Sequence, residues 1–274
     1  MRVTGATRLV GLVGHPVSHS LSPRMQNAAF AAAGLDWAYV PLPVEPERLE
    51  AGMAGLADLG FAGATVTIPH KVAALAFCDE LDPVAERAGS VNTLVVRDGR
   101  IAGSSTDGAA VVGAAAVEGA RALLLGAGGA AQAVATALCD AGCASVRVAA
   151  RSPERAHALA LRLTSLFPDR QVSGEESWPP AAGGADLVVN ATPVRDDALV
   201  DLAGVRQVVD LAYRADGGET ALVTAARAAG CERVVDGLDV LVAQGVASFE
   251  RWTGVEAPLE VMRAAARGEP EGPR

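Results

Sequence analysis

The chain contains one lysine, Lys71, among 23 basic residues, so the other 22 are arginines. An arginine stays charged at any usable pH, whereas a lysine can lose its proton when its surroundings shift its pKa. Lys71 follows the apolar stretch 62–68, at the end of an expected buried strand. This type and position suit a proton donor and acceptor at a reacting carbonyl group. Composition alone leaves an ordinary surface lysine as an equally good interpretation.

Hydroxyl and carboxyl groups at two expected helix starts could complete such a site. Ser20 and Ser22 precede a helix that Pro23 opens, and hydroxyls there could bind a carboxylate together with unpaired backbone N–H groups. The simpler alternatives are a plain loop hydroxyl for Ser20 and a helix cap for Ser22. Asp107, in Ser-Thr-Asp before another helix, could face a lysine across a cleft. It could also be a helix-start residue that the dipole favours, and the two roles are compatible.

A glycine-rich turn predicts a nucleotide site. The segment 126–131, Gly-Ala-Gly-Gly-Ala-Ala, fits G-x-G-x-x-G/A directly after the apolar strand 122–125 and at the start of a helix. Such glycines allow a tight turn and a close backbone approach to a pyrophosphate. A turn that needs glycine only for steric reasons is the alternative. Cofactor contacts are expected at Gly126, Gly128, Gly129 and Ala130.

The end of the following strand indicates which dinucleotide binds. NAD sites usually place a carboxylate there for the ribose hydroxyl, whereas NADP sites place a cation for the 2′-phosphate. Arg151 and Ser152 occupy this position, and Arg155 follows one helical turn later. Because an arginine can bind a phosphate with two parallel hydrogen bonds, we predict NADP rather than NAD. Glu154 is interpreted as a solvated residue at a helix start rather than as a ribose ligand.

The order of elements predicts an α/β protein. Strands and helices alternate in residues 1–105, which indicates a mostly parallel sheet, with a hairpin turn at Arg97–Arg100. A second α/β pattern begins near Arg121. Its expected strands are 122–125, 145–150, 186–190 and 208–211. Two long helices, at about 240–252 and 258–267, end the chain.

Composition excludes several classes of protein. The net charge of −9 argues against a nucleic-acid binder, and 50% hydrophobic residues exclude bulk disorder. No further His or Cys lies at metal-ligand spacing from Cys139 and Cys143, so the cysteines are interpreted as small buried apolar residues and no metal is expected. Neither a signal peptide nor a membrane span is apparent, since the segment 122–139 is typical of strand, turn and helix. A cytoplasmic protein is expected.

Five motifs carry a resemblance to a known family. They are Ser20-Leu21-Ser22-Pro23, the run Thr-Val-Thr-Ile-Pro-His-Lys at 65–71, Gly-Ser-Val-Asn-Thr-Leu at 89–94, Gly-Ser-Ser-Thr-Asp-Gly at 103–108, and a block from Gln244 through Phe249 to Trp252-Thr253-Gly254. In this order, and over nearly the whole chain, the sequence resembles the shikimate dehydrogenases.

The resemblance implies reversible reduction of 3-dehydroshikimate to shikimate with NADPH. It implies a substrate-binding domain, 1–105 plus 238–274, to which the C-terminal helices return, and a Rossmann-type doubly wound NADP-binding domain, 106–237. Lys71 and Asp107 match the catalytic acid/base pair, and Ser20 and Ser22 match residues that bind the carboxylate. The remaining implied substrate contacts are Thr67, Asn92, Asp107, Tyr213 and Gln244, with a further cofactor contact at Gly237.

The sequence departs from the family pattern at several positions. Thr65 and Ser105 stand where the family usually has asparagine. Thr65 is shorter than asparagine and offers one donor instead of two, which affects one expected hydroxyl contact. Residues 190–195 read Asn-Ala-Thr-Pro-Val-Arg and end at Arg195, whereas the family usually has Asn-Ala-Thr-Ser followed by a glycine. After Tyr213, the segment 214–218 replaces a usual proline.

Three alternatives remain open at this stage. The first is a quinate/shikimate dehydrogenase of broader specificity that uses NAD, against which Arg151 argues. The second is a paralogue that binds ligand and cofactor without turnover, against which Lys71 and Asp107 together argue. The third is a folate-interconverting dehydrogenase of similar plan, which Ser20, Ser22 and Gln244 disfavour. A small-molecule substrate is expected in each case, and the chain could be a monomer or a homodimer.

Overall fold

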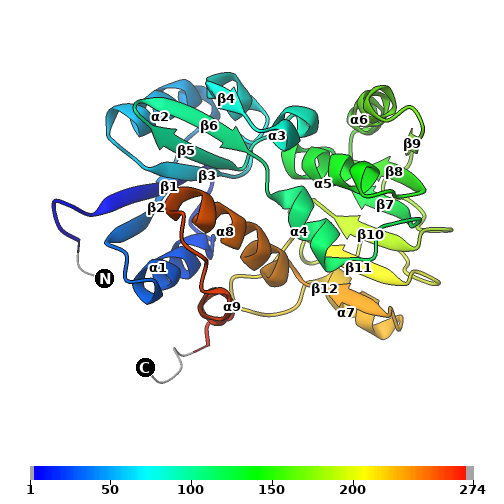
Figure 1. Cartoon of the computed structure of the whole chain (residues 1–274). Helices are drawn as coiled ribbons and strands as arrows, with labels where there is room; N and C mark the ends of the chain where they lie inside the picture. Colours follow the sequence, from blue (N-terminus) through cyan, green and yellow to red (C-terminus); the bar gives the residue numbers. More distant parts are fainter. Residues whose placement is uncertain (1–2, 270–274) are drawn as a thin grey trace. The chain divides into compact units, whose positions relative to one another are not determined.

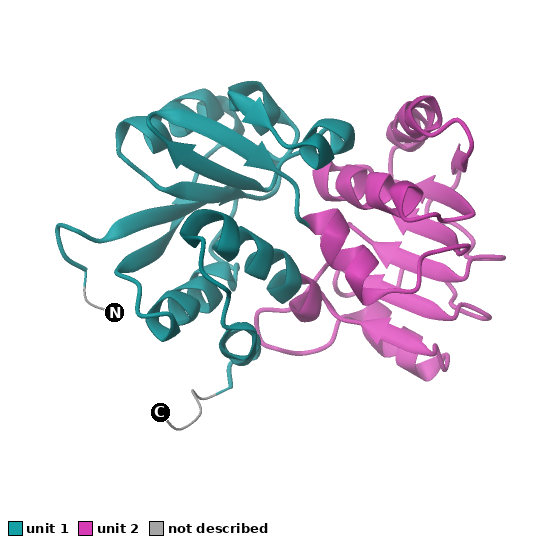
Figure 2. Ribbon diagram, in the orientation of Figure 1, with its two compact units in different colours: residues 1–106, 241–274 teal, residues 107–240 magenta. Residues whose placement is uncertain are grey.

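The computed structural model describes residues 3–269 and divides the chain into two compact units (Figure 2). Unit 1 comprises Met1–Thr106 and Leu241–Arg274, and unit 2 comprises Asp107–Val240. The sequence placed the corresponding divisions after residues 105 and 237. The expected first domain also included residues 1–2 and 270–274, which lie outside the described residues. The C-terminal segment from Leu241 belongs to the same unit as the N-terminal sheet.

Unit 1 contains a mixed six-stranded sheet in the order β2-β1-β3-β5-β6-β4. Strand β1 pairs in parallel with β2 and β3, while β5 runs antiparallel to both β3 and β6. The expected hairpin turn lies between β5 and β6, where Asp98 and Gly99 have positive φ angles of 52° and 75°. The strands are β1 (Arg8–Gly14), β2 (Trp37–Pro43), β3 (Gly63–Val66), β4 (Glu80–Leu81), β5 (Thr93–Arg97) and β6 (Arg100–Ser104).

Helices from both ends of the chain pack together in unit 1 (Figure 1). Phe30 of α1 stacks on Phe249 of α8 with ring centroids 5.3 Å apart, and Trp252 donates a hydrogen bond of 2.9 Å to the carbonyl of Leu94. These buried contacts return the C-terminal segment to the first sheet. The α-helices here are α1 (Ser22–Ala32), α2 (Leu49–Asp58), α3 (Pro83–Ala88), α8 (Gly237–Thr253, which begins in unit 2) and α9 (Leu259–Arg267), with 3₁₀ helices η1 (Pro46–Arg48) and η2 (Ala73–Phe77).

Unit 2 is a doubly wound sheet in the order β12-β11-β10-β7-β8-β9, with every pairing parallel. This is the strand order of a Rossmann fold, and the order reverses between β7 and β10, where such sheets bind ligands beyond the strand ends. The strands are β7 (Arg121–Leu125), β8 (Ser145–Ala149), β9 (Gln171–Gly174), β10 (Leu187–Asn190), β11 (Gln207–Asp210) and β12 (Arg233–Val235). The helices are α4 (Asp107–Ala114), α5 (Gly129–Asp140), α6 (Pro153–Leu166) and α7 (Ala221–Ala228).

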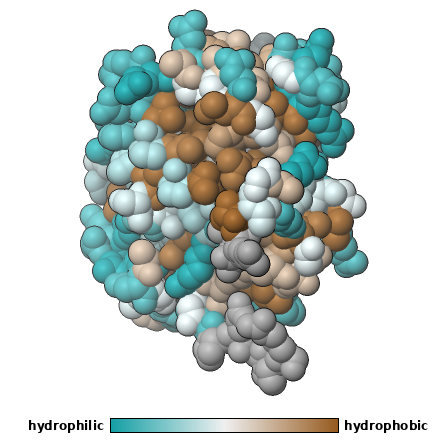
Figure 3. Space-filling model, turned by 90° about the vertical axis from the view of Figure 1, so that its left-hand side faces the viewer, coloured by the Kyte–Doolittle hydropathy of each residue, from teal (hydrophilic) through white to brown (hydrophobic). Residues whose placement is uncertain are grey.

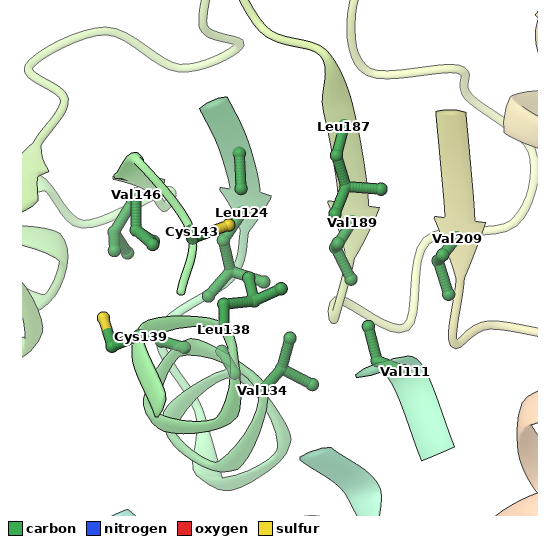
Figure 4. Close-up of a cluster of buried hydrophobic side chains, with 14 of the residues drawn as sticks. Val111, Leu124, Val134, Leu138, Cys139, Cys143, Val146, Leu187, Val189 and Val209 are labelled. Atoms are coloured by element: carbon green, nitrogen blue, oxygen red, sulfur yellow. The ribbon is translucent and has the colours of Figure 1, made fainter. Parts of the chain in front are cut away.

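Apolar side chains between α5 and the sheet form a core of unit 2 (Figure 4). Leu124 and Leu138 are fully buried there, and Cys139 and Cys143 lie among them. Burial raises the pKa of the Cys139 thiol to about 12 and that of Cys143 to about 11. Cys139 and Cys143 are buried apolar residues, as expected, but the same interpretation is wrong for Cys78 and Cys231, which are only partly buried. No group of three or more metal-ligating side chains occurs among residues 3–269.

The lengths of the helices and the apolar residues at the surface indicate what the protein can contact. Within the described part of the chain, no helix has the length and apolar character needed to cross a membrane. One face of the protein shows apolar side chains gathered between hydrophilic ones (Figure 3). Exposed large apolar residues of unit 1 include Leu59 and Leu259. Apolar surface of this kind is common at protein–protein contacts.

Candidate functional site

The loop after β1 carries Ser20 and Ser22 to the start of α1. Helix α1 begins at Ser22, and its N-cap residue is Leu21, with no capping hydrogen bond from a side chain. The alternative interpretation of Ser22 as a plain helix cap is therefore wrong, because a cap residue precedes the first helical residue. The backbone N–H of Ser22 donates to the Ser20 hydroxyl over 3.2 Å, which brings the two serines together. Ser22 is 7% exposed.

The loop after β3 holds Lys71 in a fixed backbone position. The N–H of Thr67 donates to the carbonyl of Val13 over 2.8 Å, and the N–H of Val91 donates to the carbonyl of Lys71 over 2.8 Å. The buried His70 ring contacts the carbonyl of Val44 over 2.6 Å. Lys71 itself is half-buried. Thr67 is half-buried in the same loop.

A buried hydrogen-bond network joins Asn92, Thr106 and Gln244 in unit 1. The Asn92 Nδ2 donates to Thr106 Oγ1 over 2.8 Å, and the Thr106 N–H donates to Asn92 Oδ1 over 2.9 Å. Asn92 Nδ2 also lies 3.5 Å from Gln244 Oε1, while the Thr106 hydroxyl donates to the Gln244 carbonyl over 3.2 Å. Asn92 and Thr106 are each 2% exposed. The network fixes two expected substrate contacts relative to each other. The sequence did not single out Thr106, which was visible only as the residue before Asp107.

Asp107 is the first residue of α4 and the first residue of unit 2. Its side chain is 5% exposed. The expectation that it stands at a helix start is confirmed, and a carboxylate there is favoured by the helix dipole. Lys71 belongs to unit 1, so the two members of the expected acid/base pair come from different units.

Thr65, which replaces the usual asparagine, is paired inside unit 1. Its hydroxyl forms a hydrogen bond with the hydroxyl of Tyr39, and both residues are buried. The Tyr39 ring lies against Trp252 with centroids 6.0 Å apart. In this structure the only polar group of the Thr65 side chain is therefore hydrogen-bonded to Tyr39.

The glycine-rich turn after β7 has two kinds of glycine. Gly126 has a φ of +116°, and a Cβ there would lie 3.1 Å from the carbonyl oxygen of Ala191, so both backbone conformation and close packing require glycine. At Gly128 an added Cβ would meet no chain atom within 4 Å. Steric demands of the chain therefore explain Gly126 but not Gly128, whose open space suits the approach of an external group. Gly129 begins α5, followed by Ala130, so this N-terminus can receive a pyrophosphate.

Gly237 has a packing role that the sequence did not reveal. A Cβ at this position would overlap the carbonyl of Ala212, in the loop after β11. Glycine therefore lets the start of α8 lie against that loop. Tyr213 follows Ala212 and is half-buried.

The segment that follows β8 and begins α6 contains the residues expected to bind the 2′-phosphate. Ser152 is the N-cap of α6, and its hydroxyl oxygen accepts a hydrogen bond of 3.3 Å from the backbone N–H of Arg155. Arg151 and Arg155 are exposed. Glu154 is also exposed, as expected, but its carboxylate accepts a 2.6 Å hydrogen bond from the Ser152 hydroxyl.

A buried carboxylate ties together the loops after β10 and β11. Asp210 accepts hydrogen bonds from Asn190 Nδ2 (2.8 Å), the Ala212 N–H (2.9 Å) and the Thr220 hydroxyl (2.5 Å). Asn190 in turn accepts from the N–H and hydroxyl of Thr192 over 2.9 and 2.7 Å. Burial raises the pKa of Asp210 to about 6. The sequence did not select Asp210, although an aspartate closing an apolar strand was visible.

Comparison with known proteins gives a consistent result along the chain. Residues 12–94 match the family model for the shikimate dehydrogenase substrate binding domain, residues 110–212 that for shikimate / quinate 5-dehydrogenase, and residues 237–267 that for the shikimate 5'-dehydrogenase C-terminal domain. A shikimate dehydrogenase (NADP(+)) from Rubrobacter xylanophilus is 48% identical, and the match covers 98% of each chain.

Solved structures of similar proteins share the fold. A crystal structure of a shikimate dehydrogenase in complex with NADP+ has a TM-score of 0.86 and 35% identity, covering 97% of this chain and 96% of the other. A quinate dehydrogenase from Corynebacterium glutamicum in complex with NAD has a TM-score of 0.79 and 31% identity, covering 94% and 98%. The fold alone therefore does not separate the two activities.

Proposed function

Because this chain belongs to the shikimate dehydrogenase family, we propose that it catalyses the reversible NADPH-dependent reduction of 3-dehydroshikimate to shikimate. The observation that carries the proposal is the 48% identity to a shikimate dehydrogenase (NADP(+)) across 98% of both chains. Family membership also removes the folate-interconverting alternative.

Lys71 serves as the acid/base in this reaction. Bound NADPH supplies the hydride that reduces the carbonyl carbon of the substrate. Negative charge then develops on the carbonyl oxygen, and Lys71 donates a proton from Nζ to that oxygen to complete the alcohol. In the oxidation direction, neutral Lys71 takes the hydroxyl proton back. Asp107 is the proposed partner that orients the ammonium group, and its burial at the start of α4 supports this role.

Substrate binding is assigned mainly to unit 1, with Tyr213 contributed by unit 2. Ser20 and Ser22 are proposed to bind the carboxylate, supported by the hydrogen bond from the Ser22 N–H to the Ser20 hydroxyl and by the absence of a capping role for Ser22. Asn92 and Gln244 are proposed to bind ring hydroxyls, supported by the Thr106 network that fixes them. Thr67 and Tyr213 are further proposed contacts that are half-buried in loops.

Cofactor binding is assigned to the strand ends of unit 2. The backbone at Gly126, Gly128, Gly129 and Ala130 is proposed to receive the pyrophosphate. The 2′-phosphate is assigned to Arg151, Ser152 and Arg155, because two guanidinium groups and a hydroxyl suit a dianionic phosphate. Gly237 lets α8 begin close to the loop that carries Tyr213.

Arg151 and Ser152 also favour shikimate dehydrogenase over a quinate/shikimate dehydrogenase that uses NAD. The test is turnover of shikimate and quinate by the purified protein, each with NADP+ and with NAD+. The proposal requires the highest kcat/KM for the pair of shikimate and NADP+. A preference for quinate with NAD+ would establish the alternative activity, and no turnover of either substrate would establish a binding paralogue.

Two further properties accompany this activity. A cytoplasmic location is proposed, in line with a pathway enzyme that consumes NADPH. The apolar area in Figure 3 supports a homodimer among the two assemblies that the sequence left open. The mass in dilute solution, measured by sedimentation, decides between monomer and dimer.

A further inference from the structure

Glu154 places a carboxylate inside the segment assigned to the 2′-phosphate. It lies in the first turn of α6, one residue from Arg155, and its Oε2 accepts a 2.6 Å hydrogen bond from the hydroxyl of Ser152. The Ser152 oxygen meanwhile accepts the backbone N–H of Arg155 over 3.3 Å. A hydroxyl has a single proton to donate. In this structure the Ser152 proton is directed to Glu154.

The carboxylate is ionised at neutral pH. The hydrogen bond from Ser152 is the main cause that lowers the pKa of Glu154. Arg151 and Arg155, which flank it closely in the sequence, are both exposed. The ring nitrogens of the nearby His157 contact other groups than Glu154. Its Nε2 lies 3.1 Å from the Glu176 carboxylate, and its Nδ1 lies 2.7 Å from the carbonyl of Pro153.

We propose that Glu154 is a specificity-determining residue that occupies the Ser152 donor in place of the 2′-phosphate and so limits the preference for NADPH over NADH. The inference rests on the proposed function, because it requires the 2′-phosphate to bind at Arg151 and Ser152. It concerns a residue that none of the expected cofactor contacts includes.

The two cofactors meet this carboxylate differently. A 2′-phosphate that binds Ser152 must displace Glu154 from the hydroxyl and then lie near its negative charge. Like charges at such separations repel, and partial exposure to water weakens the repulsion without removing it. The ribose 2′-hydroxyl of NADH carries no charge and can donate a hydrogen bond to the same carboxylate. Glu154 therefore weakens NADPH binding and leaves NADH binding unchanged or improved.

The test is Glu154→Gln, which keeps the size of the side chain and removes its charge. Glu176→Gln is the matched control, because it removes an exposed carboxylate that pairs with His157 and has no hydrogen bond to Ser152 in the structure. For each protein, kcat/KM is measured with NADPH and with NADH at saturating 3-dehydroshikimate. Binding of adenosine 2′,5′-bisphosphate is measured by calorimetry as a probe of the 2′-phosphate contacts alone.

We expect Glu154→Gln to raise the NADPH/NADH ratio of kcat/KM by about three- to tenfold and to tighten the probe by a similar factor, since charge-assisted contacts to phosphate are strengthened. Glu176→Gln should change both by less than about twofold. In a Ser152→Ala background, where the shared hydroxyl is gone, the effect of Glu154→Gln should shrink. If the wild type binds the probe tightly but Glu154→Gln leaves the NADPH/NADH ratio of kcat/KM unchanged or lowers it, the role of Glu154 is wrong while the assigned phosphate site stands. No probe binding by the wild type overturns the assigned phosphate site and the inference with it.

Discussion

The side-chain amide of Asn92 donates a 2.8 Å hydrogen bond to the hydroxyl of Thr106, the residue that directly precedes Asp107. The same hydroxyl donates to the backbone carbonyl of Gln244 on α8. One buried threonine thus links the residue before β5 to the C-terminal helix that returns to unit 1. We therefore propose Thr106 as a positioning residue, because it holds the Asn92 side chain and the Gln244 backbone, and both residues are assigned to substrate binding.

Replacing Thr106 with valine, which has the same shape, removes this link. Asn92 and Gln244 lose their shared partner, so we expect KM for shikimate to rise about tenfold, with a loss of about 1–3 kcal/mol in the free energy of unfolding. Thr136→Val is the control, since Thr136 is an equally buried threonine whose hydroxyl donates to the Gln132 carbonyl within α5. Steady-state kinetics and urea unfolding check both variants. Equal changes in KM for the two variants would contradict the positioning role.

The two serines of the carboxylate site give a second prediction. Ser22→Ala should raise KM for shikimate by about tenfold or more, because a charge-assisted hydrogen bond is lost, while kcat changes little. The melting temperature should stay the same, since Ser22 does not cap α1. The exposed Ser18 in the same loop provides the control variant Ser18→Ala. A Ser22→Ala protein that loses stability but keeps its KM would show a structural serine.

Asp210 makes stability depend on pH. Its folded-state pKa of about 6 lies above the ordinary value of 3.8, so the neutral form is favoured in the folded protein. The stabilising contribution is therefore complete below pH 3.8 and is lost as the pH rises through 6. Relative to Asp210→Asn, which does not titrate, the wild type should lose up to about 3 kcal/mol between pH 4 and 7.

Urea unfolding across this pH range gives the free energy of unfolding of the wild type and of Asp210→Asn. Contributions from other titrating groups cancel in the difference between the two values. Asp201→Asn controls for the loss of one negative charge, because Asp201 accepts a backbone N–H from Ala203 in an exposed position. A constant difference between the wild type and Asp210→Asn from pH 4 to 7 would show that the carboxylate does not change its protonation there.

The single lysine permits a chemical test. Apart from the N-terminal amine, an amine-selective acylating reagent has only Lys71 to modify. One equivalent bound at Lys71, located by peptide mass spectrometry, should abolish activity, and bound shikimate should slow the modification. Full activity after complete modification of Lys71 would exclude it from the reaction.

Much of the fold could be predicted from the sequence because apolar runs bounded by glycine or polar residues coincide with most strands of both sheets. The short edge strands β4, β9 and β12 were not predicted, since segments such as Gln171–Gly174 have no apolar run and gain their conformation from the neighbouring strand. The hairpin β5–β6 makes the first sheet mixed, which alternation of strands and helices alone did not require.

Candidate site residues could be proposed from the sequence where a motif has unusual chemistry, as at Lys71 and the glycine-rich turn. Thr106 and Asp210 were missed because a lone threonine or aspartate carries no pattern, and their roles arise from hydrogen-bond partners that only the fold brings to them, such as Gln244 for Thr106 and Asn190 for Asp210. A shift of one residue in the start of α1 decides whether Ser22 is its N-cap, and the spacing of residues in the sequence does not define a helix start that closely.

In the proposed mechanism, Lys71 transfers the proton of an NADP-dependent shikimate dehydrogenase reaction. The most direct test is the steady-state oxidation of shikimate with NADP+ by wild type and Lys71→Ala, followed by NADPH absorbance, with kcat and KM determined separately. Removal of the acid/base should lower kcat by about 10²- to 10⁴-fold while KM for shikimate changes by less than about threefold. A Lys71→Ala protein with near-normal kcat would contradict the account.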